Sequence, residues 1–454
     1  MAGFLSCGAV GDGRQGHGTR SAPQFYQDLI VRANRLYILG VPSPAAAADP
    51  SSALPVLVLI RGALAPADAG RPLLGLSLER RVVLAARRAC FGAVYSLGQD
   101  RAAPAGGVAV GDWAGLAAAL QGAAAPPLAI APTGLLAETD WLKRLAETRL
   151  EPAAWAALPD RLVLIAPAAT PEALATLAGL GSDADLPAVI EALSRRFGAP
   201  AQPPAAIDPM LLTTPADRRA AERRLLRGLV KDTDGFMARH VERPMSLAVS
   251  RLLAGTPITP NQMTLFSVAV GLVGAPGFLS AAPFWQTVGA LLLLAHSILD
   301  GCDGELARLR FQESRWGGIL DFWGDNVVHA VVFACMAIGW SNAAGADWPL
   351  LLGAAAVAGA IGSASLVYWR TMRPKADNGP LYTSVSAAPG QRLARLLDAL
   401  SRRDFIYLVV ACALFGKAAW FLVLAGLGAP IFLILLFVLA ARERVAPAVT
   451  PTGA

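Results

Sequence analysis

Hydrophobic residues are spread unevenly along this chain. Up to about residue 240 they form short runs between polar and Pro-rich stretches, whereas from Met263 on several runs approach the roughly 20 residues needed to cross about 30 Å of hydrocarbon. These long runs predict six spans: Met263–Ala281, Trp285–Leu306, Gly317–Trp340, Trp348–Trp369, Phe405–Phe421 and Val423–Ala441. Either Gly416-Lys417 or Gly426–Pro430 fits the turn between the last two. We therefore expect a soluble N-terminal half and an all-α, six-helix transmembrane bundle after it.

The short runs of the N-terminal half alternate with helix-like segments. Buried strands are expected at Leu54–Ile60, Gly92–Leu97, Pro127–Pro132 and Arg161–Pro167, and helices at Leu78–Phe91, Asp140–Thr148 and Leu186–Phe197. Strands that alternate with helices predict a parallel, doubly wound α/β sheet.

Changes in pattern also divide the chain into segments. We expect a flexible tail (1–22), the α/β domain (23–200), a Pro- and Ala-rich linker (201–215), basic amphipathic interfacial helices (216–258), the membrane domain (259–443) and a second tail (444–454). The first interfacial helix, which Asp217 can cap, carries six basic residues beside an apolar side. Such a helix typically lies at a membrane surface, although an ordinary solvated helix is the alternative.

Composition and charge agree with a membrane protein. The chain is 55% hydrophobic, has a mean hydropathy of +0.48 and a net charge of +6. The basic residues cluster beside the spans, which argues against nucleic-acid binding and places both termini and the loop after the second span in the cytoplasm. The expected location is the cell (inner) membrane, with several spans. The five cysteines show no zinc or redox spacing, which fits a reducing compartment.

Four aspartates interrupt the apolar pattern around the third predicted span. Asp300 and Asp303 end the second span at i and i+3, and Asp321 and Asp325 begin the third at i and i+4. Each pair shares a helix face, and the short loop Leu309–Trp316 makes the two helices antiparallel neighbours. Four carboxylates then converge, and like charges that close need cations. Mg²⁺ or Mn²⁺, completed by phosphate oxygens, suits such a site best.

Small residues accompany the aspartates. Gly301, Gly304, Ala307, Gly317 and Gly318 remove side chains from the two facing helices. They either allow close helix packing or leave room for a ligand. Arg308 follows Gly304 by one helical turn and could pair with a diphosphate.

The spacing Asp-x2-Asp-Gly-x2-Ala-Arg-x8-Gly-x3-Asp-x3-Asp resembles the signature of the CDP-alcohol phosphotransferase family. It is complete here as Asp300, Asp303, Gly304, Ala307, Arg308, Gly317, Asp321 and Asp325. The preceding "TPITPNQMT" also resembles the start of that family's first span. The resemblance covers roughly Lys231 to Glu443.

The resemblance implies a six-helix membrane enzyme with two divalent metal ions. Such an enzyme transfers a substituted phosphoryl group from a CDP-alcohol to a lipid or polar alcohol and releases CMP, next to membrane lipids; a homodimer is compatible with it. By the same resemblance, the four aspartates are metal ligands and Asp325 also takes the acceptor's proton. Gly304, Ala307 and Gly317 leave space for the cytidine, Arg308 holds the diphosphate, and Asn261 lies near the nucleotide.

Other polar residues are weaker candidates. Arg315, Arg370, Arg373 and Lys375 lie on the same side of the membrane and either anchor it or bind a phosphate on the acceptor. His296 and His329 lie one turn from aspartates and either support them or pack with a satisfied hydrogen bond.

The N-terminal half resembles a nucleotidyltransferase domain, in "LVLIRGALAPADAGRPLLGLSLERRVVLAARRACFGAVYSL". Such domains are fused to phosphotransferases in bifunctional enzymes of inositol-phosphate lipid and solute synthesis. This chain has no Gly-rich loop ending in a basic residue after the first strand, only Gly62 and Gly70. We therefore expect a degenerate domain without cytidylyl transfer.

Two other functions compete with a phosphotransferase. Intramembrane carboxylates often mark cation pathways, so a divalent cation transporter is one alternative. However, these aspartates gather near one interface, not along a path. A non-catalytic membrane scaffold is the second, and the complete set of four aspartates argues against it.

Overall fold

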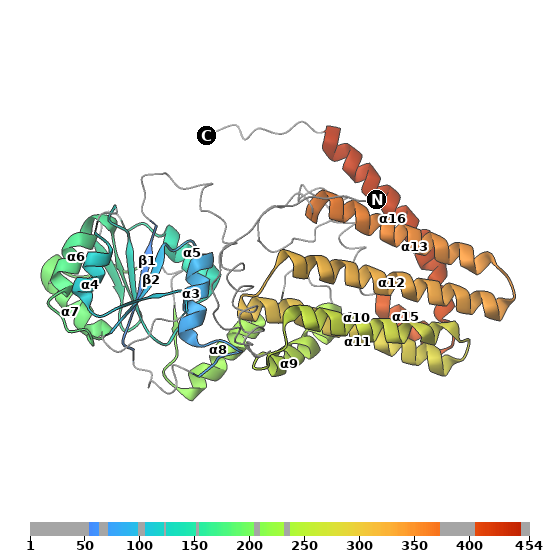
Figure 1. Cartoon of the computed structure of the whole chain (residues 1–454), viewed down its shortest axis with the longest axis horizontal. Helices are drawn as coiled ribbons and strands as arrows, with labels where there is room; N and C mark the ends of the chain where they lie inside the picture. Colours follow the sequence, from blue (N-terminus) through green and yellow to red (C-terminus); the bar gives the residue numbers. More distant parts are fainter. Residues whose placement is uncertain are drawn as a thin grey trace, which may run out of the picture. The chain divides into compact units, whose positions relative to one another are not determined.

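The computed structural model describes residues 54–62, 71–98, 105–121, 124–150, 154–203, 209–230, 237–372 and 405–445. They form an α/β part and a helical part, each considered by itself (Figure 1). The predicted N-terminal tail and nearly all of the C-terminal one lie outside the described residues.

A six-stranded mixed sheet forms the centre of the α/β part. Its strands are β1 (Val56–Ile60), β2 (Ala93–Leu97), β3 (Val108–Val110), β4 (Leu128–Pro132), β6 (Trp155–Leu158) and β7 (Leu162–Ile165), in the order β3-β2-β1-β4-β7-β6. The first four are parallel, but β7 runs antiparallel to β4 and to β6. The expectation of a wholly parallel sheet is therefore wrong at this edge. A tight turn joins β6 to β7, and strands joined that closely can pair only antiparallel.

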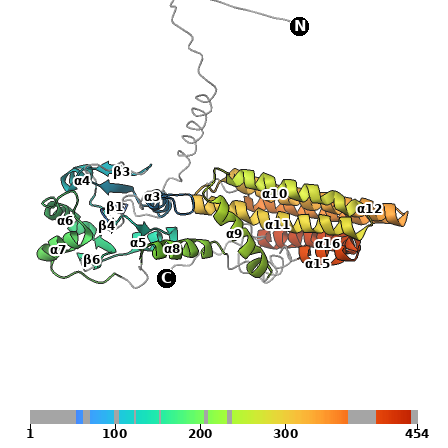
Figure 2. The ribbon, with the colours of Figure 1, turned by 90° about the horizontal axis from the view of Figure 1, so that it is seen from below.

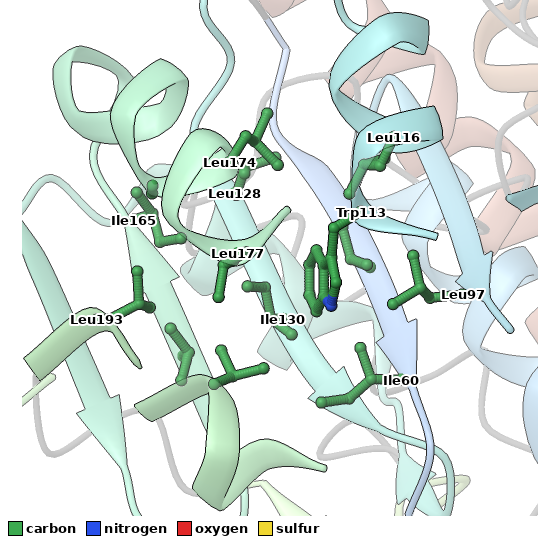
Figure 3. Close-up of a cluster of buried hydrophobic side chains, with 14 of the residues drawn as sticks. Ile60, Leu97, Trp113, Leu116, Leu128, Ile130, Ile165, Leu174, Leu177 and Leu193 are labelled. Carbon is green, nitrogen blue, oxygen red and sulfur yellow. The ribbon is translucent and has the colours of Figure 1, made fainter. Parts of the chain in front are cut away.

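Helices cover both faces of the sheet, because successive residues of a strand point to opposite sides. Val56, Val58 and Ile60 pack with α4 (Trp113–Ala119), α6 (Thr170–Leu177) and α7 (Leu186–Phe197). Figure 3 shows the fully buried ring of Trp113 at the centre of this layer. Leu57 and Leu59 face the other way, toward α3 (Leu78–Arg88) and α5 (Thr139–Glu147).

The chain leaving β1 lies directly against the chain leaving β4. The backbone N–H of Gly62 donates to Thr133 Oγ1 at 3.1 Å, and a Cβ on Gly62 would collide with the Thr133 carbonyl. In doubly wound sheets, ligands bind at the carboxyl ends of strands where the strand order reverses, which is between β1 and β4 here. Residues 63–70, where a phosphate loop would follow, lie outside the described residues, so the expected lack of cytidylyl transfer stays a prediction.

The segment expected to be a linker contains a short strand, β8 (Met210–Leu211), which pairs with β5 (Leu135–Leu136). The next helix, α8 (Pro215–Arg227), is capped by Thr214, one turn earlier than the expected cap Asp217. Thr214 accepts from the Asp217 N–H, and Asp217 accepts from Thr214 in return, which is a capping box. Hydrogen bonds from Thr213 and Thr214 lower the pKa of Asp217 to about 2.

The helical part is a bundle, and shorter helices precede it in the chain (Figure 2). Its elements are η2 (Ala238–Glu242), α9 (Arg243–Leu253), α10 (Pro260–Gly274), η3 (Ala275–Leu279), α11 (Pro283–Arg310), α12 (Arg315–Ala344), α13 (Trp348–Val367), η4 (Tyr368–Met372), α15 (Phe405–Leu414) and α16 (Ala418–Val445).

Among the described residues, four helical stretches are long and apolar enough to cross a membrane: Pro260–Leu279, Arg315–Ala344, Trp348–Arg370 and Ala418–Ala441. The protein is accordingly a membrane protein. α11 has 28 residues, about 42 Å in length, but the second half of this helix is rich in charged residues. α15 has only 10 residues, so the predicted count of six spans is not established.

The turn between the last two helices is at Phe415–Lys417, where Gly416 has a φ of 65°. The alternative at Gly426–Pro430 is wrong, because those residues lie inside α16. The predicted boundary near Phe421 is therefore also wrong.

Glycines set the closest contacts between the bundle helices. A Cβ on Gly359 of α13 would lie 2.5 Å from the Ala429 carbonyl carbon of α16, and a Cβ on Gly274 of α10 would lie 3.0 Å from the Gly289 carbonyl oxygen of α11. Small residues allow such approach where lipid supplies no hydrophobic drive between helices.

Candidate metal and nucleotide site

Three of the four aspartates come together between α11 and α12. Carboxylate oxygens of Asp300, Asp303 and Asp321 lie within 4.8 Å of one another. A tight turn brings the two helices together: Phe311 ends α11 in the left-handed conformation with a φ of 58°. Ser314 then caps α12 by accepting from the Gly317 N–H at 3.0 Å. Figure 2 shows α10, α11 and α12 running beside one another.

Asp303 is fixed by two hydrogen bonds. The Thr264 hydroxyl of α10 donates to Asp303 Oδ2, and the Gly304 N–H donates to Asp303 Oδ1. Thr264 is 1% exposed, so the bond is shielded from water. A third helix therefore takes part in orienting the carboxylates.

The residues present fit a divalent metal. Oδ1 of Asp321 is buried and has no hydrogen-bond donor among the described residues, as expected of an oxygen that awaits a cation. A cluster of carboxylates offers hard oxygen ligands only, which favours Mg²⁺ or Mn²⁺ over softer metals.

Asp325 does not belong to this group of three carboxylates; it is buried on α12, one turn after Asp321. Its Oδ1 is 3.4 Å from His296 Nε2 of α11. His296 Nδ1 is 2.9 Å from the Ser267 carbonyl oxygen, which can only accept, so Nδ1 carries a hydrogen there. Nε2 is thus the ring nitrogen that faces Asp325.

Two polar side chains border the glycines of the signature. A Cβ on Gly317 would lie 3.0 Å from Asn261 Oδ1, and a Cβ on Gly304 would lie 3.4 Å from Arg308 Nη1. Asn261 and Arg308 therefore border the bulk-free positions of α12 and α11. Ala307 lies on α11, three residues after Gly304, and is buried.

The residues considered for the acceptor are only partly described. Arg315 begins α12, and Arg370 lies in η4. The rings of Trp323 and Tyr368 are 5.8 Å apart, which places η4 beside the end of α12 that carries Asp321. Arg373 and Lys375 lie outside the described residues. His329 packs edge-on against the Phe405 ring at 5.4 Å.

Sequence reasoning missed a buried polar cluster beside the signature. Glu305 is 0% exposed and accepts hydrogen bonds from three side chains of α9. A carboxylate inserted between Gly304 and Ala307 of the signature was the available signal, because a charge inside such a segment needs a partner.

The site is thus a cluster of carboxylates between two helices of a bundle whose helices are apolar enough to cross a membrane. Residues 257–388 match the family model of CDP-alcohol phosphatidyltransferase. This match agrees with the family resemblance that the signature predicted for this part of the chain.

Known relatives share this region. A protein of Rubrobacter xylanophilus named bifunctional IPC transferase and DIPP synthase is 40% identical over 143 residues, which is 31% of this chain and 32% of that protein. The archaetidylinositol phosphate synthase of Pyrococcus horikoshii is 30% identical over 99 residues, 22% of this chain and 50% of the relative. The alignments thus span a third to a half of these relatives.

A crystal structure of Mycobacterium tuberculosis phosphatidylinositol phosphate synthase with CDP-DAG bound aligns with 47% of this chain and 98% of its own. The identity is 18% and the TM-score 0.31, which is too low to establish a shared fold.

Proposed function

We propose that this protein is a membrane-integral CDP-alcohol phosphotransferase of polar-lipid synthesis, which transfers a substituted phosphoryl group to an acceptor alcohol and releases CMP. The observation that carries the proposal is the convergence of Asp300, Asp303 and Asp321 from two helices with the complete family signature around them. A cation pathway would instead distribute its carboxylates along the bundle.

Each signature residue receives a role in this proposal. Gly304, Ala307 and Gly317 leave room for the cytidine, with Asn261 at its edge. Arg308 pairs with the diphosphate, since a guanidinium matches phosphate oxygens in pairs.

The four aspartates hold the metal, and Asp325 also accepts the proton of the acceptor hydroxyl. That oxygen bonds to the phosphorus of the alcohol phosphate, and the bond to the CMP oxygen breaks. Two bound Mg²⁺ or Mn²⁺ ions would neutralise the diphosphate and the leaving CMP.

The names of the relatives guide the choice of substrates. Archaetidylinositol phosphate is the product that the name of the Pyrococcus horikoshii relative contains. We therefore propose a CDP-linked lipid as donor and an inositol phosphate as the first acceptor to test, with Arg315, Arg370, Arg373 and Lys375 as candidates for binding its phosphate. We place the site and the α/β part on the cytoplasmic side of the cell membrane. There the site can bind either a water-soluble CDP-alcohol or a CDP-linked lipid of the membrane.

The test is release of CMP by the purified full chain in lipid nanodiscs. CDP-diacylglycerol and soluble CDP-alcohols are each offered with inositol phosphate, glycerol phosphate or a lipid alcohol. We expect CMP from at least one pair, complete loss with EDTA, and recovery with Mg²⁺ or Mn²⁺. Asp300→Asn and Asp321→Asn should abolish the reaction, because each removes a charged oxygen from a shared site.

Absence of CMP from the whole panel, together with no metal-dependent binding of CDP, would overturn the proposal. Metal flux into proteoliposomes without any CDP-alcohol would support a transporter instead. Full activity in either Asp→Asn variant would refute the metal-ligand assignment alone.

A further inference from the structure

Glu305 is a fully buried carboxylate that no step of the proposed reaction uses. Its Oε1 accepts from Arg243 Nη1 at 2.9 Å and from Ser246 Oγ at 2.7 Å, and its Oε2 accepts from Ser250 Oγ at 2.7 Å. All three donors lie on α9, which precedes the first span. Both carboxylate oxygens are thus satisfied by one helix.

Such an ion pair is a poor way to hold two helices together. Removing two charges from water costs several kcal/mol per ion, and well-packed apolar residues of similar volume are often as stable or more so. A pair of leucines would serve to dock α9 on α11. An apolar pair could not hold a guanidinium at a fixed place.

The place where Arg243 is held lies on the bulk-free face of α11. Its Nη1 is 3.5 Å from where a Cβ on Gly301 would be, just as Arg308 Nη1 lies beside Gly304. Gly301 and Gly304 are three residues apart and therefore neighbours on the helix surface. The side chain of Arg243 is only 14% exposed, so its charge is held largely out of water. The positive charge of Arg243 is also close enough to repel that of Arg308.

We propose that Arg243 is a second arginine for the anionic diphosphate of the donor nucleotide, and that Glu305 is the positioning residue that holds it beside Gly301. This inference rests on the proposed function, because it takes a CDP-alcohol as the ligand. Arg243 Nη1 and Arg308 Nη1 both lie beside glycines of this face, and two guanidiniums can donate together to the oxygens of one diphosphate. Arg243 lies outside the eight signature positions, so the motif alone does not indicate it.

The test compares nucleotide binding by the full chain in nanodiscs with Mg²⁺ present. CDP is the charged probe, and cytidine, measured by competition with CDP, is the uncharged one. Arg243→Gln should raise the dissociation constant for CDP roughly tenfold or more, the usual loss for a hydrogen bond to a charged group. The affinity for cytidine should not change, because cytidine has no phosphate. Arg251→Gln is the matched control: Arg251 is on the same helix but pairs with Glu222 and is 59% exposed.

The double variant Arg243→Gln/Glu305→Gln separates binding from stability. It removes both buried charges, so its unfolding temperature should recover toward that of the wild type while its CDP affinity stays low. If Arg243→Gln alone does not fold, the CDP affinity of the double variant is the measurement that tests the role of Arg243.

Four outcomes are informative. Wild-type protein that does not bind CDP with Mg²⁺ would refute the proposed function itself. Wild-type binding together with an unchanged CDP affinity in Arg243→Gln would refute the role of Arg243 only. A parallel loss of CDP and cytidine affinity, or a return of CDP affinity in the double variant, would show that the pair is purely structural and overturn the inference.

Discussion

Asp325 differs from the other three aspartates in its surroundings. It does not belong to the close group of three carboxylates, and its Oδ1 lies 3.4 Å from His296 Nε2. A carboxylate that faces an imidazole rather than only other carboxylates is suited to exchanging a proton. The role proposed for Asp325 as proton acceptor can therefore be tested separately from metal binding.

Asp325→Asn should therefore affect turnover more than binding. We expect kcat to fall by roughly 10²–10⁴-fold, the range for general-base catalysis, with most of the CDP-alcohol affinity retained. Both are measured at saturating Mg²⁺, with Asp347→Asn as the control, because Asp347 is exposed at the opposite end of the helices. A parallel collapse of affinity would make Asp325 chiefly a metal ligand, and a near-normal kcat would assign the proton to another group.

Thr264 orients Asp303, a carboxylate of the proposed metal site, through a hydrogen bond. Thr264→Val keeps the shape but removes the hydroxyl that donates to Asp303. Loss of such supporting hydrogen bonds typically costs roughly 10–100-fold in metal affinity or activity. We expect the Mg²⁺ concentration for half-maximal CMP release to rise, and Thr264→Ser to restore it.

Thr287→Val serves as the control for this variant. The Thr287 hydroxyl likewise donates a hydrogen bond between helices, but to the backbone carbonyl of Ala413, at 3.3 Å. This bond lies at the end of α11 away from the aspartates. An unchanged Mg²⁺ requirement in Thr264→Val would show that Asp303 does not depend on this bond.

Among the elements, α13 and α16 approach each other through a glycine. A Cβ on Gly359 would lie 2.5 Å from the Ala429 carbonyl carbon and 2.6 Å from Pro430 N, both of which are backbone atoms that cannot move aside easily. Gly428 is the residue before Ala429 on α16, and a Cβ on Gly428 would have nothing within 4 Å. Replacing Gly359 by alanine therefore changes both helix packing and helix propensity, whereas replacing Gly428 changes helix propensity alone.

Gly359→Ala should lower the unfolding temperature of the protein in detergent, because the helices must separate. Gly428→Ala should leave it unchanged or raise it, since alanine is favoured over glycine in a helix by about 1 kcal/mol. Fluorescence-monitored unfolding compares the two variants with the wild type. Equal shifts would mean that the close contact does not contribute to stability.

Across the whole molecule, the α/β part raises the question of a second activity. Its strand order places β1 and β4 where nucleotide sites usually form, yet Gly62 packs against the Thr133 backbone at that point. With no Gly-rich loop ending in a basic residue in the sequence, we predict that the full chain does not form a CDP-alcohol from CTP.

Pyrophosphate release is the measurement for this prediction. The full chain is incubated with CTP, Mg²⁺ and inositol phosphate or glycerol phosphate, and a heat-inactivated sample is the control. Pyrophosphate above that control would show that the domain carries out cytidylyl transfer although it lacks the Gly-rich loop pattern.

The sequence by itself determined where the long apolar helices begin, the main strands and helices with strong hydrophobic patterns, and that aspartates of two successive helices come together. These features depend on local information: a run of apolar residues is long enough or it is not, and i, i+3 and i, i+4 spacings fix a helix face. Short elements such as β3, α4 and β6 were missed, because three to seven residues carry too little periodicity to stand out.

Only the tertiary structure decided which residues far apart in the chain meet. One example is the antiparallel edge of the sheet. Others are the contacts of Thr264 with Asp303 and of Arg243 with Glu305, which join residues 39 and 62 positions apart. No local pattern encodes such pairs, since they follow from how α9, α10 and α11 pack against one another. Burial then decides their importance, because a carboxylate with no access to water must be matched by donors that the fold itself brings to it.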